Sequence, residues 1–322
     1  MDRHHLDELK TRIGLLDYLS SYHWQPCRRT AGGQVSGLCP LHTETKPSFW
    51  IHTRKNYFYC HGCGRGGDLI RLVELYHGLR FPEAVAHLRR LTANSSLLQD
   101  AMSFYQEQLR RRPEAMRYLA QRGLHDAATL TALGIGYAPG ACLAAHLRRL
   151  GYAPDQLRQA GLTNAEDRDT LYRRIVFPHG ETLYGRSIDP DASAPHRFLR
   201  TGKGGLFRWH ELASGSEVIL VEGFFDVAAL WQAGFVHATC GGGTHFNPTQ
   251  FQQLITGART IWIAFDGDAA GQQTALHLSA RLHQAGQPAR CVLLPPAQDP
   301  ASYFATGGSP AEFHALLEQA LP

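Results

Sequence analysis

Apolar and polar positions follow three successive patterns along this chain. In the first, apolar residues recur at helical spacing over residues 4–22, which predicts one amphipathic helix. Two strand-like stretches and two further helices are then expected near 35–39, 48–60, 68–77 and 82–92. Arg54-Lys55-Asn56 is expected to turn the second stretch into a hairpin. The polar residues 92–97 predict the first domain boundary, so the first domain spans residues 1–95.

The second pattern is helical and then strand-like. Residues 98–165 are expected to be mainly helical, and strands are expected at Leu171–Phe177 and Thr182–Ser187. A loop rich in Pro, Gly and basic residues follows over 189–208. These segments predict a second domain over residues 98–213.

The third pattern alternates strands with helices after Ser214-Gly215-Ser216 and predicts a domain over 214–322. Strands are expected at 217–221, 235–239, 260–265 and 289–294. Helices are expected at 224–233, 247–256 and 269–285, with one more near 309–320. The fold class is therefore multidomain, with an α+β front part and an α/β parallel sheet at the end.

Cysteine and histidine spacing predicts a metal site in the first domain. Cys39-x2-His42 is followed after 17 residues by Cys60-x2-Cys63. Two such pairs on tight turns suit tetrahedral Zn²⁺, and four protein ligands make a structural site. His52 and His61 are spare candidates that do not fit the paired spacing. Metal binding is expected to supply much of the folding free energy of residues 30–66.

Aromatic and basic residues surround this predicted site. The rings belong to Phe49, Trp50, Tyr57, Phe58 and Tyr59. The cations Arg54, Lys55 and Arg65 lie among them, which favours binding of a single nucleic-acid strand by stacking and charge. The alternative is that about half of the rings cover the metal site, because every second residue of a strand points inward. The basic hairpin tip is the stronger candidate for DNA.

Acidic residues end two of the strands in the third domain. Glu222 follows the strand 217–221, and Asp266 and Asp268 follow the strand 260–265. The carboxyl ends of parallel strands share one sheet edge, so these carboxylates are expected to converge there and bind Mg²⁺ or Mn²⁺. Asp299 is a further candidate ligand. Asp226 lies one helical turn after Glu222 and either joins the site or positions Glu222.

Helix capping is the competing interpretation for these acids, and Asp268 before Ala-Ala-Gly fits it well. Charge is uneven along the chain. Residues 214–322 hold 8 acidic and 3 basic side chains, against 20 and 29 in the first 213. A basic front part beside an acidic site favours a nucleic-acid partner, although the 28 Arg and 4 Lys also fit a compositional bias. No signal peptide or apolar span is found, so a cytoplasmic protein without membrane contact is expected.

These motifs together resemble the bacterial DnaG-type primase family. The Cys/His module followed by Gly-Gly-Asp-Leu-Ile is similar to its CHC2-type zinc domain. Val-Glu-Gly-Phe-Phe-Asp (221–226) and Asp-Gly-Asp-Ala-Ala-Gly (266–271) are similar to the two signatures of its TOPRIM catalytic subdomain. Arg174-Ile-Val-Phe-Pro, Tyr184-Gly-Arg186 and Arg197-Phe-Leu-Arg200 resemble the segment that precedes TOPRIM in primases.

The resemblance implies an enzyme that makes short RNA primers on single-stranded DNA from NTPs. Glu222, Asp266 and Asp268 would then bind the catalytic ions, with Asp299 in support. The zinc module would help to engage the template and choose a start site. The residues expected to contact phosphates of template or nucleotide are Arg186, Arg197, Arg200, Lys203 and Arg208.

The chain departs from the family pattern in several places. Asp299-Pro300-Ala301 stands where the family usually has Asp-Pro-Asp, and Phe224 stands where Tyr is common. Arg197-Phe198-Leu199-Arg200 replaces Lys-Tyr-Leu-Asn. The sequence ends soon after the TOPRIM pattern, from which we expect a short primase of a mobile element without the helicase-binding domain; a replicative helicase remains a candidate partner. A TOPRIM nuclease and a non-catalytic adaptor for single-stranded DNA are the alternatives.

Overall fold

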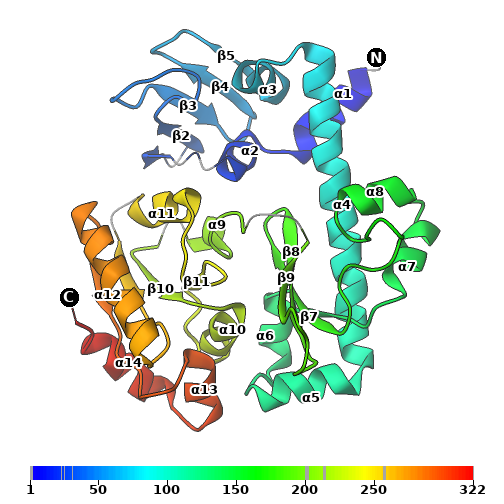
Figure 1. Cartoon of the computed structure of the whole chain (residues 1–322). Coiled ribbons are helices and arrows are strands. Elements are labelled where there is room, and N and C mark those ends of the chain that lie inside the picture. Colours follow the sequence, from blue (N-terminus) through cyan, green and yellow to red (C-terminus); the bar gives the residue numbers. More distant parts are fainter. Residues whose placement is uncertain are drawn as a thin grey trace. The chain divides into compact units, whose positions relative to one another are not determined.

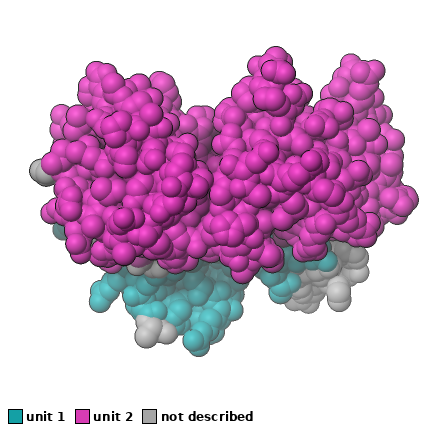
Figure 2. Space-filling model, turned by 90° about the horizontal axis from the view of Figure 1, so that it is seen from below, with its two compact units in different colours: residues 1–96 teal, residues 97–322 magenta. Residues whose placement is uncertain are grey.

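The computed structural model describes residues 3–22, 24, 26–30, 32–199, 203–212, 215–256 and 259–321. The chain divides into two compact units, unit 1 (residues 1–96) and unit 2 (residues 97–322), which are coloured separately in Figure 2. Within the described residues, no helix combines the length and the apolar character that crossing a membrane requires.

Unit 1 is built on one antiparallel sheet, the ribbon sheet, with strand order β1-β2-β3-β4-β5. Its strands are β1 (Arg28–Arg29), β2 (Gln34–Gly37), β3 (Phe49–His52), β4 (Tyr57–Cys60) and β5 (Gly66–Asp68). Its helices are α1 (Arg3–Arg12), α2 (Leu15–Ser21), α3 (Leu69–His77) and the first part of α4 (Phe81–Arg111), as Figure 1 shows. The predicted hairpin between β3 and β4 is confirmed, with its turn over residues 53–56.

The predicted single helix over 4–22 is wrong, because the chain breaks between α1 and α2. Gly14 has extended backbone angles there and caps α2. The side chain of Asn56 donates to the carbonyls of Lys10 and Ile13 and accepts the N–H of Leu15 at 2.6 Å. Asn56 therefore satisfies the backbone groups that the break leaves unpaired, a long-range contact that helical spacing does not reveal.

The helix expected to end near residue 92 continues through the polar stretch 92–97, which is predicted as the first domain boundary, because α4 runs without interruption from Phe81 to Arg111. No Gly or Pro occurs between Glu83 and Arg111 to stop the helix. The hydroxyl of Thr92 donates to the Leu88 carbonyl at 3.0 Å, and Leu97 is buried. The division between the two units falls inside this helix, between residues 96 and 97.

The described residues of unit 2 form two sheets. The middle sheet is antiparallel with order β6-β7-β8-β9, formed by Gly136–Ala138, Arg174–His179, Thr182–Ser187 and His196–Phe198. The parallel sheet has order β11-β10-β12-β13, formed by β10 (Glu217–Val221), β11 (Ala238–Cys240), β12 (Thr260–Ile263) and β13 (Ala289–Cys291). The predicted alternation of strands and helices is confirmed, although β11 begins three residues later than expected and β6 was not predicted.

The helices of unit 2 fall into two groups along the chain. The first group comprises α5 (Pro113–Gln121), α6 (Ala127–Ala132), α7 (Leu143–Arg149), α8 (Pro154–Gln159) and α9 (Trp209–Leu212). The second comprises α10 (Phe224–Gln232), α11 (Pro248–Ile255), α12 (Ala269–Gln284), α13 (Pro300–Ala305) and α14 (Pro310–Glu318).

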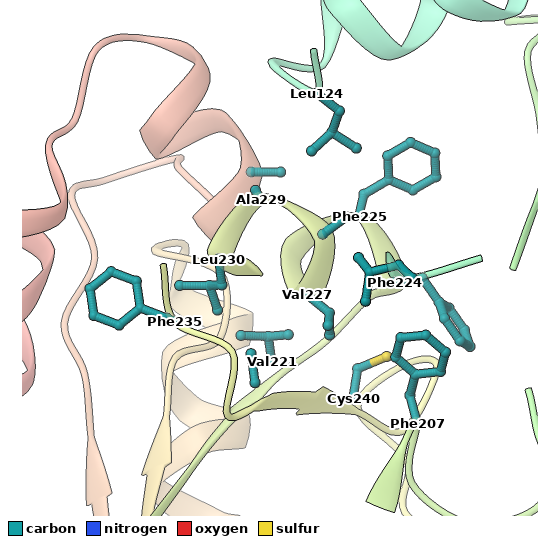
Figure 3. Packing of buried hydrophobic residues seen from close by; sticks show 14 of the residues in the cluster. Leu124, Phe207, Val221, Phe224, Phe225, Val227, Ala229, Leu230, Phe235 and Cys240 are labelled. Carbon is teal, nitrogen blue, oxygen red and sulfur yellow. The ribbon is translucent and has the colours of Figure 1, made fainter. Parts of the chain in front are cut away.

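The parallel sheet is covered on both faces, which explains its continuous apolar strands. Along β10, Ile219 and Val221 belong to the core that holds α10, α13 and α14, whereas Val218 and Leu220 belong to the core that holds α11 and α12. Figure 3 shows the first of these cores around Val221, with side chains from α10 and Phe235 and Cys240 nearby. The expected fold class is confirmed.

Candidate metal centres and nucleic-acid surface

Cys39, His42, Cys60 and Cys63 come together in unit 1, and their ligand atoms all lie within 4.8 Å of one another. The first pair follows β2, and the second pair lies at the end of β4 and in the turn after it. Burial, with the neighbouring Cys60, raises the pKa of Cys39 to about 12. A cation would therefore favour the ionised form of the Cys39 thiol, and the donor set of three Cys and one His fits a structural zinc ion.

Glu44 orients the histidine of this cluster. Its Oε2 lies 3.2 Å from Nε2 of His42, and its Oε1 accepts the N–H of Cys39 at 2.7 Å. Hydrogen bonding, first of all from the Ser48 side chain, lowers the pKa of Glu44. Nε2 of His42 thus faces a carboxylate, and Nδ1 faces the cluster, 3.9 Å from Sγ of Cys60. Sequence reasoning missed Glu44, whose signal is an acid two positions after a predicted ligand.

The outward face of the ribbon sheet carries a groove of about 800 Å³. It is lined by Gln34, Trp50, Ile51, His52, Tyr57, Phe58, Tyr59, His61, Gly64, Gly66 and Gly67. Trp50 pairs with Tyr59 and His52 pairs with Tyr57 across β3 and β4, while Phe49 and Phe58 are buried on the other face. The prediction that strand alternation sends part of the rings inward is confirmed.

Tyr59 lies over a glycine of the neighbouring strand. A Cβ atom at Gly66 would come within 2.7 Å of the Tyr59 ring. Tyr57 and Tyr59 remain 43% exposed. Arg54 and Lys55 are exposed at the hairpin turn, and Arg65 donates to the Leu41 carbonyl at 3.0 Å while also remaining exposed. Unit 1 therefore presents exposed aromatic rings together with basic side chains.

In unit 2, the loops that follow β10 and β12 bring acids together. The two strands pair in parallel from Glu217↔Thr260 to Leu220↔Ile263. Glu222 therefore reaches the loop after β12, where its Oε1 accepts the N–H of Asp266 at 3.2 Å. The structure thus places Glu222 beside Asp266, as the strand-end argument predicts.

The charges of these acids act on one another. Burial, followed by the charges of Glu222, Asp299 and Asp268, raises the pKa of Asp266 to about 7. Burial also raises the pKa of Glu222, and the charges of Asp268 and Asp299 add to this effect. Ionised carboxylates that lie close together repel one another. A hard divalent cation, which prefers oxygen ligands, would relieve that repulsion.

Asp268 and Asp299 also cap helices, so the competing interpretation holds for both. Asp268 accepts the N–H of Gly271 at 2.7 Å at the start of α12, and Asp299 accepts the N–H of Ser302 at 2.5 Å at the start of α13. Capping fixes where each carboxylate stands and leaves lone pairs for a cation. Gly267, directly before Asp268, packs closely against the loop that precedes Asp299. A Cβ atom at this position would lie 2.2 Å from the Pro295 carbonyl oxygen.

The basic side chains of unit 2 that are predicted to contact phosphates differ in how many bonds they already make within the protein. Arg197 is exposed and donates to the Thr170 carbonyl at 3.1 Å. Arg186 donates to Tyr118 and to His196. Arg208 donates to the Ala132 carbonyl at 2.8 Å, pairs with Glu211 and covers the Trp231 ring, three contacts that favour a structural role. Arg200 lies outside the described residues.

Cations converge around His196 of β9. Burial lowers the pKa of His196, and the charges of Arg186, Arg122, Arg174 and Lys203 lower it further. Arg174 is buried and donates to the carbonyls of Gly185, Ala194 and Pro195, so it holds the loop before β9 in place. Sequence reasoning found Arg174 only within a motif; its signal is a cation inside an otherwise apolar strand.

An aromatic cluster links this basic region to the acids. Phe224, two residues after Glu222, stacks on Tyr184 of β8 with ring centroids 4.2 Å apart. Phe198 of β9 lies 6.1 Å from Phe224. Both positions at which the family commonly has Tyr therefore meet in one apolar cluster, where a phenol hydroxyl would need a partner.

Known families match most of the chain in sequence. Residues 1–103 match a CHC2 zinc finger, residues 104–188 match the N-terminal domain of the DNA primase catalytic core, and residues 219–304 match a Toprim-like domain. The chain is 29% identical to the DNA primase of Myxococcus xanthus over 363 residues, an alignment that covers 99% of this chain and 59% of that protein.

This chain belongs to the DnaG-type primase family. The DnaG-type primase of Chlamydia trachomatis is likewise 29% identical and covers 98% of the chain. The structure of the zinc-binding and RNA polymerase domains of Aquifex aeolicus primase covers 98% of the chain at 27% identity, with a TM-score of 0.65. A DnaG primase catalytic domain bound to single-stranded DNA covers 73% of the chain at 28% identity, with a TM-score of 0.61.

The chain spans only part of its DnaG-type relatives. It covers between 46% and 66% of the length of the DNA primases named above and of those of Aquifex aeolicus and Streptomyces coelicolor. The similarity nevertheless includes both candidate metal centres, because the CHC2 match contains the Cys/His cluster and the Toprim match contains Glu222 through Asp299.

Replacing Glu44 by Gln should weaken zinc binding by about 10- to 100-fold, because His42 loses the charged partner of its outer nitrogen. Competition with a chromophoric chelator measures this affinity. Glu83→Gln is the matched control, since Glu83 also accepts a backbone amide in unit 1, from Arg80, but lies outside the cluster. Equal zinc affinity of Glu44→Gln and the control would contradict the assigned role.

Magnesium should stabilise the protein more at about pH 8 than at about pH 5.5. The pKa of Asp266, raised to about 7, lies above its unfolded value, so the stability linked to its proton is present in acid and is lost as the pH rises through 7. A divalent ion binds the ionised form and offsets that loss. Thermal melts with and without Mg²⁺, at constant ionic strength, measure the difference. Asp266→Asn should abolish its pH dependence; an unchanged dependence in this variant would refute the explanation.

Proposed function

We propose that this chain is a DNA primase, a DNA-directed RNA polymerase that makes short RNA primers on a single-stranded DNA template. The observation that carries the proposal is the meeting of Glu222 with Asp266 at the carboxyl edge of the parallel sheet. The same unit presents a basic region on β8 and β9, linked to the acids through Phe224. Acids for divalent ions and cations for phosphates are the two requirements of nucleotidyl transfer.

Glu222, Asp266 and Asp268 would hold two Mg²⁺ or Mn²⁺ ions, with Asp299 in support. When bound, such ions stabilise charge on the attacking and leaving oxygens of a phosphoryl group. The 3′-hydroxyl oxygen of the growing primer would form the new bond to the α-phosphorus of an NTP while its proton passes to solvent, and the bond from the α-phosphorus to the oxygen bridging to the β-phosphate would break to release pyrophosphate. The protein contributes position, because Asp268 and Asp299 are fixed as helix caps and Glu222 by the Asp266 amide.

The basic residues would steer and hold the phosphates. Arg186, Arg197 and Lys203 keep donors beyond those used within the protein and stand on or near the strands that meet Phe224. The Nζ atom of Lys203 lies 3.0 Å from where a Cβ of Gly243 would stand, and the N–H of Gly243 donates to the Glu222 carbonyl at 2.8 Å. Lys203 is therefore held beside the loop that borders Glu222, which suits contact with a nucleotide phosphate.

The groove of unit 1 would engage the unpaired template. The exposed rings of Tyr57 and Tyr59 and the half-buried ring of Trp50 line this groove and offer faces on which bases stack. The cations at the hairpin turn suit the sugar-phosphate backbone. Zinc held by Cys39, His42, Cys60 and Cys63 would fix the end of β4 against the loop after β2. Loss of zinc is therefore expected to weaken template binding indirectly.

Glu222→Gln should abolish primer synthesis while single-stranded DNA binding stays unchanged, because the substitution removes a charge for the ions and leaves both DNA surfaces intact. The assay follows labelled NTPs on mixed single-stranded templates. Glu217→Gln is the matched control, since Glu217 lies at the other end of β10. Normal synthesis by Glu222→Gln would refute the assigned site.

The same assay separates the two alternative functions. A TOPRIM nuclease would cleave the template without added NTPs, whereas a primase leaves it intact. A non-catalytic adaptor would bind the template and make no product with any variant. Product that requires NTPs, template and Glu222 supports the primase alone.

Tyr59→Ala should weaken binding of single-stranded DNA by roughly 5- to 150-fold, the equivalent of about 1–3 kcal/mol for one stacked base. Fluorescence anisotropy with a labelled oligonucleotide and the zinc-loaded full chain measures the affinity. Tyr59→Phe keeps the ring and should bind like the wild type. Equal affinity of Tyr59→Ala and Tyr59→Phe would exclude stacking at this position.

A further inference from the structure

Asp226 joins two segments that carry acids of the candidate site. It lies in the first turn of α10, and its Oδ2 accepts the N–H of Gly223 at 3.0 Å, directly after Glu222. Its Oδ1 accepts the N–H of Ala301 at 3.2 Å, two residues after Asp299. One carboxylate thus bonds to the loop after β10 and to the start of α13, although the two lie 75 residues apart in sequence.

The candidate site needs such a connection. The charges of Asp268 and Asp299 oppose ionisation of Glu222, so the acids repel one another whenever no cation is present. Glu222 and Asp299 lie on different loops, so repulsion between their carboxylates opposes the approach of these loops, which the packing of α10 against α13 and any polar bond between them offset. Within the described residues, the Asp226 carboxylate links these loops directly, because it accepts one hydrogen bond from the backbone N–H of Gly223 and one from that of Ala301.

Asp226 is more deeply buried than the other acids of the candidate site. The residue is 7% exposed, and both of its oxygens face backbone amides. Its bond to α13 uses the backbone of Ala301, a position where an Asp would set a second buried carboxylate beside it. The Ala at this position, which departs from the family pattern, places no second carboxylate beside Asp226 and is therefore compatible with Asp226 as a link.

We propose that Asp226 is a positioning residue that ties the Glu222 loop to the start of α13 and so sets the spacing of Glu222 and Asp299. The proposal rests on the proposed function, since it concerns the ions of that site. It assigns Asp226 a role through the backbone rather than as a ligand, and it makes the amide of Ala301 the other half of the link.

The test measures Mn²⁺ binding to the zinc-loaded full chain by electron paramagnetic resonance, without NTP or DNA. Asp226→Asn should weaken Mn²⁺ binding by about 10-fold or more, because an amide group presents N–H to one of the two backbone donors. Ala301→Pro removes the other half of the link and leaves the Asp226 carboxylate in place. Proline is tolerated in the first turn of a helix, where Ala301 stands, so α13 should still form.

Both variants should lose Mn²⁺ affinity to a similar extent, and a higher Mn²⁺ concentration should restore primer synthesis in both. Asp126→Asn is the matched control, because Asp126 also accepts two backbone amides at a helix start in unit 2 but lies outside the acidic site. It should lose thermal stability without losing Mn²⁺ affinity, which separates positioning from a general loss of stability.

Three outcomes would overturn the proposal. Unchanged Mn²⁺ affinity in Asp226→Asn would show that the link does not matter for the site. Normal affinity in Ala301→Pro together with a loss in Asp226→Asn would make Asp226 a ligand instead. An equal loss in Asp126→Asn would make the effect one of stability. A wild type that binds Mn²⁺ but makes no primers would refute the proposed function while leaving the positioning role measurable.

Discussion

The parallel pairing of β10 with β12 is the constraint on which the candidate site depends. Because Leu220 aligns with Ile263, the next residues of both strands emerge at one edge, and Glu222 receives the N–H of Asp266. That hydrogen bond to the backbone holds the Glu222 side chain near the Asp266 carboxylate, although burial and neighbouring charges raise the pKa of both acids. The fold thus concentrates negative charge at a fixed place, and a divalent ion is the natural partner for it.

Aromatic packing connects the basic side chains of β8 and β9 to the loop that carries Glu222. Phe224 continues directly from the acidic loop and stacks on Tyr184, whose strand also carries Arg186. The hydroxyl of Tyr184 in turn lies 2.6 Å from Nδ1 of His196, around which the cations of unit 2 gather. Among the described residues, no ion pair joins these acids to the cations around His196, so both remain available to a triphosphate and its ions.

Sequence patterns predicted what depends on local chemistry. The Cys/His spacing, the hairpin turn and the strand-end acids were all readable, because each rests on a few neighbouring residues and one periodicity. The contacts missed were long-range. Asn56 bonds to the backbone at the break between α1 and α2, 41 residues before it in the sequence. The Glu44 carboxylate lies beside Nε2 of His42 only once the intervening turn has folded. The helix through 92–97 shows the opposite limit, since polar residues end a helix only where a breaker or a competing partner is present.

The central claim is that acids from separate strands hold divalent ions beside a basic region. Diffraction from crystals of the full chain grown with Mn²⁺ and an NTP, recorded at the manganese absorption edge, tests it most directly. The account predicts anomalous peaks within about 2.3 Å of carboxylate oxygens of Glu222 and of the Asp266–Asp268 loop, bridged to nucleotide phosphates. Peaks that avoid Glu222, or a nucleotide bound away from this edge of the parallel sheet, would contradict it.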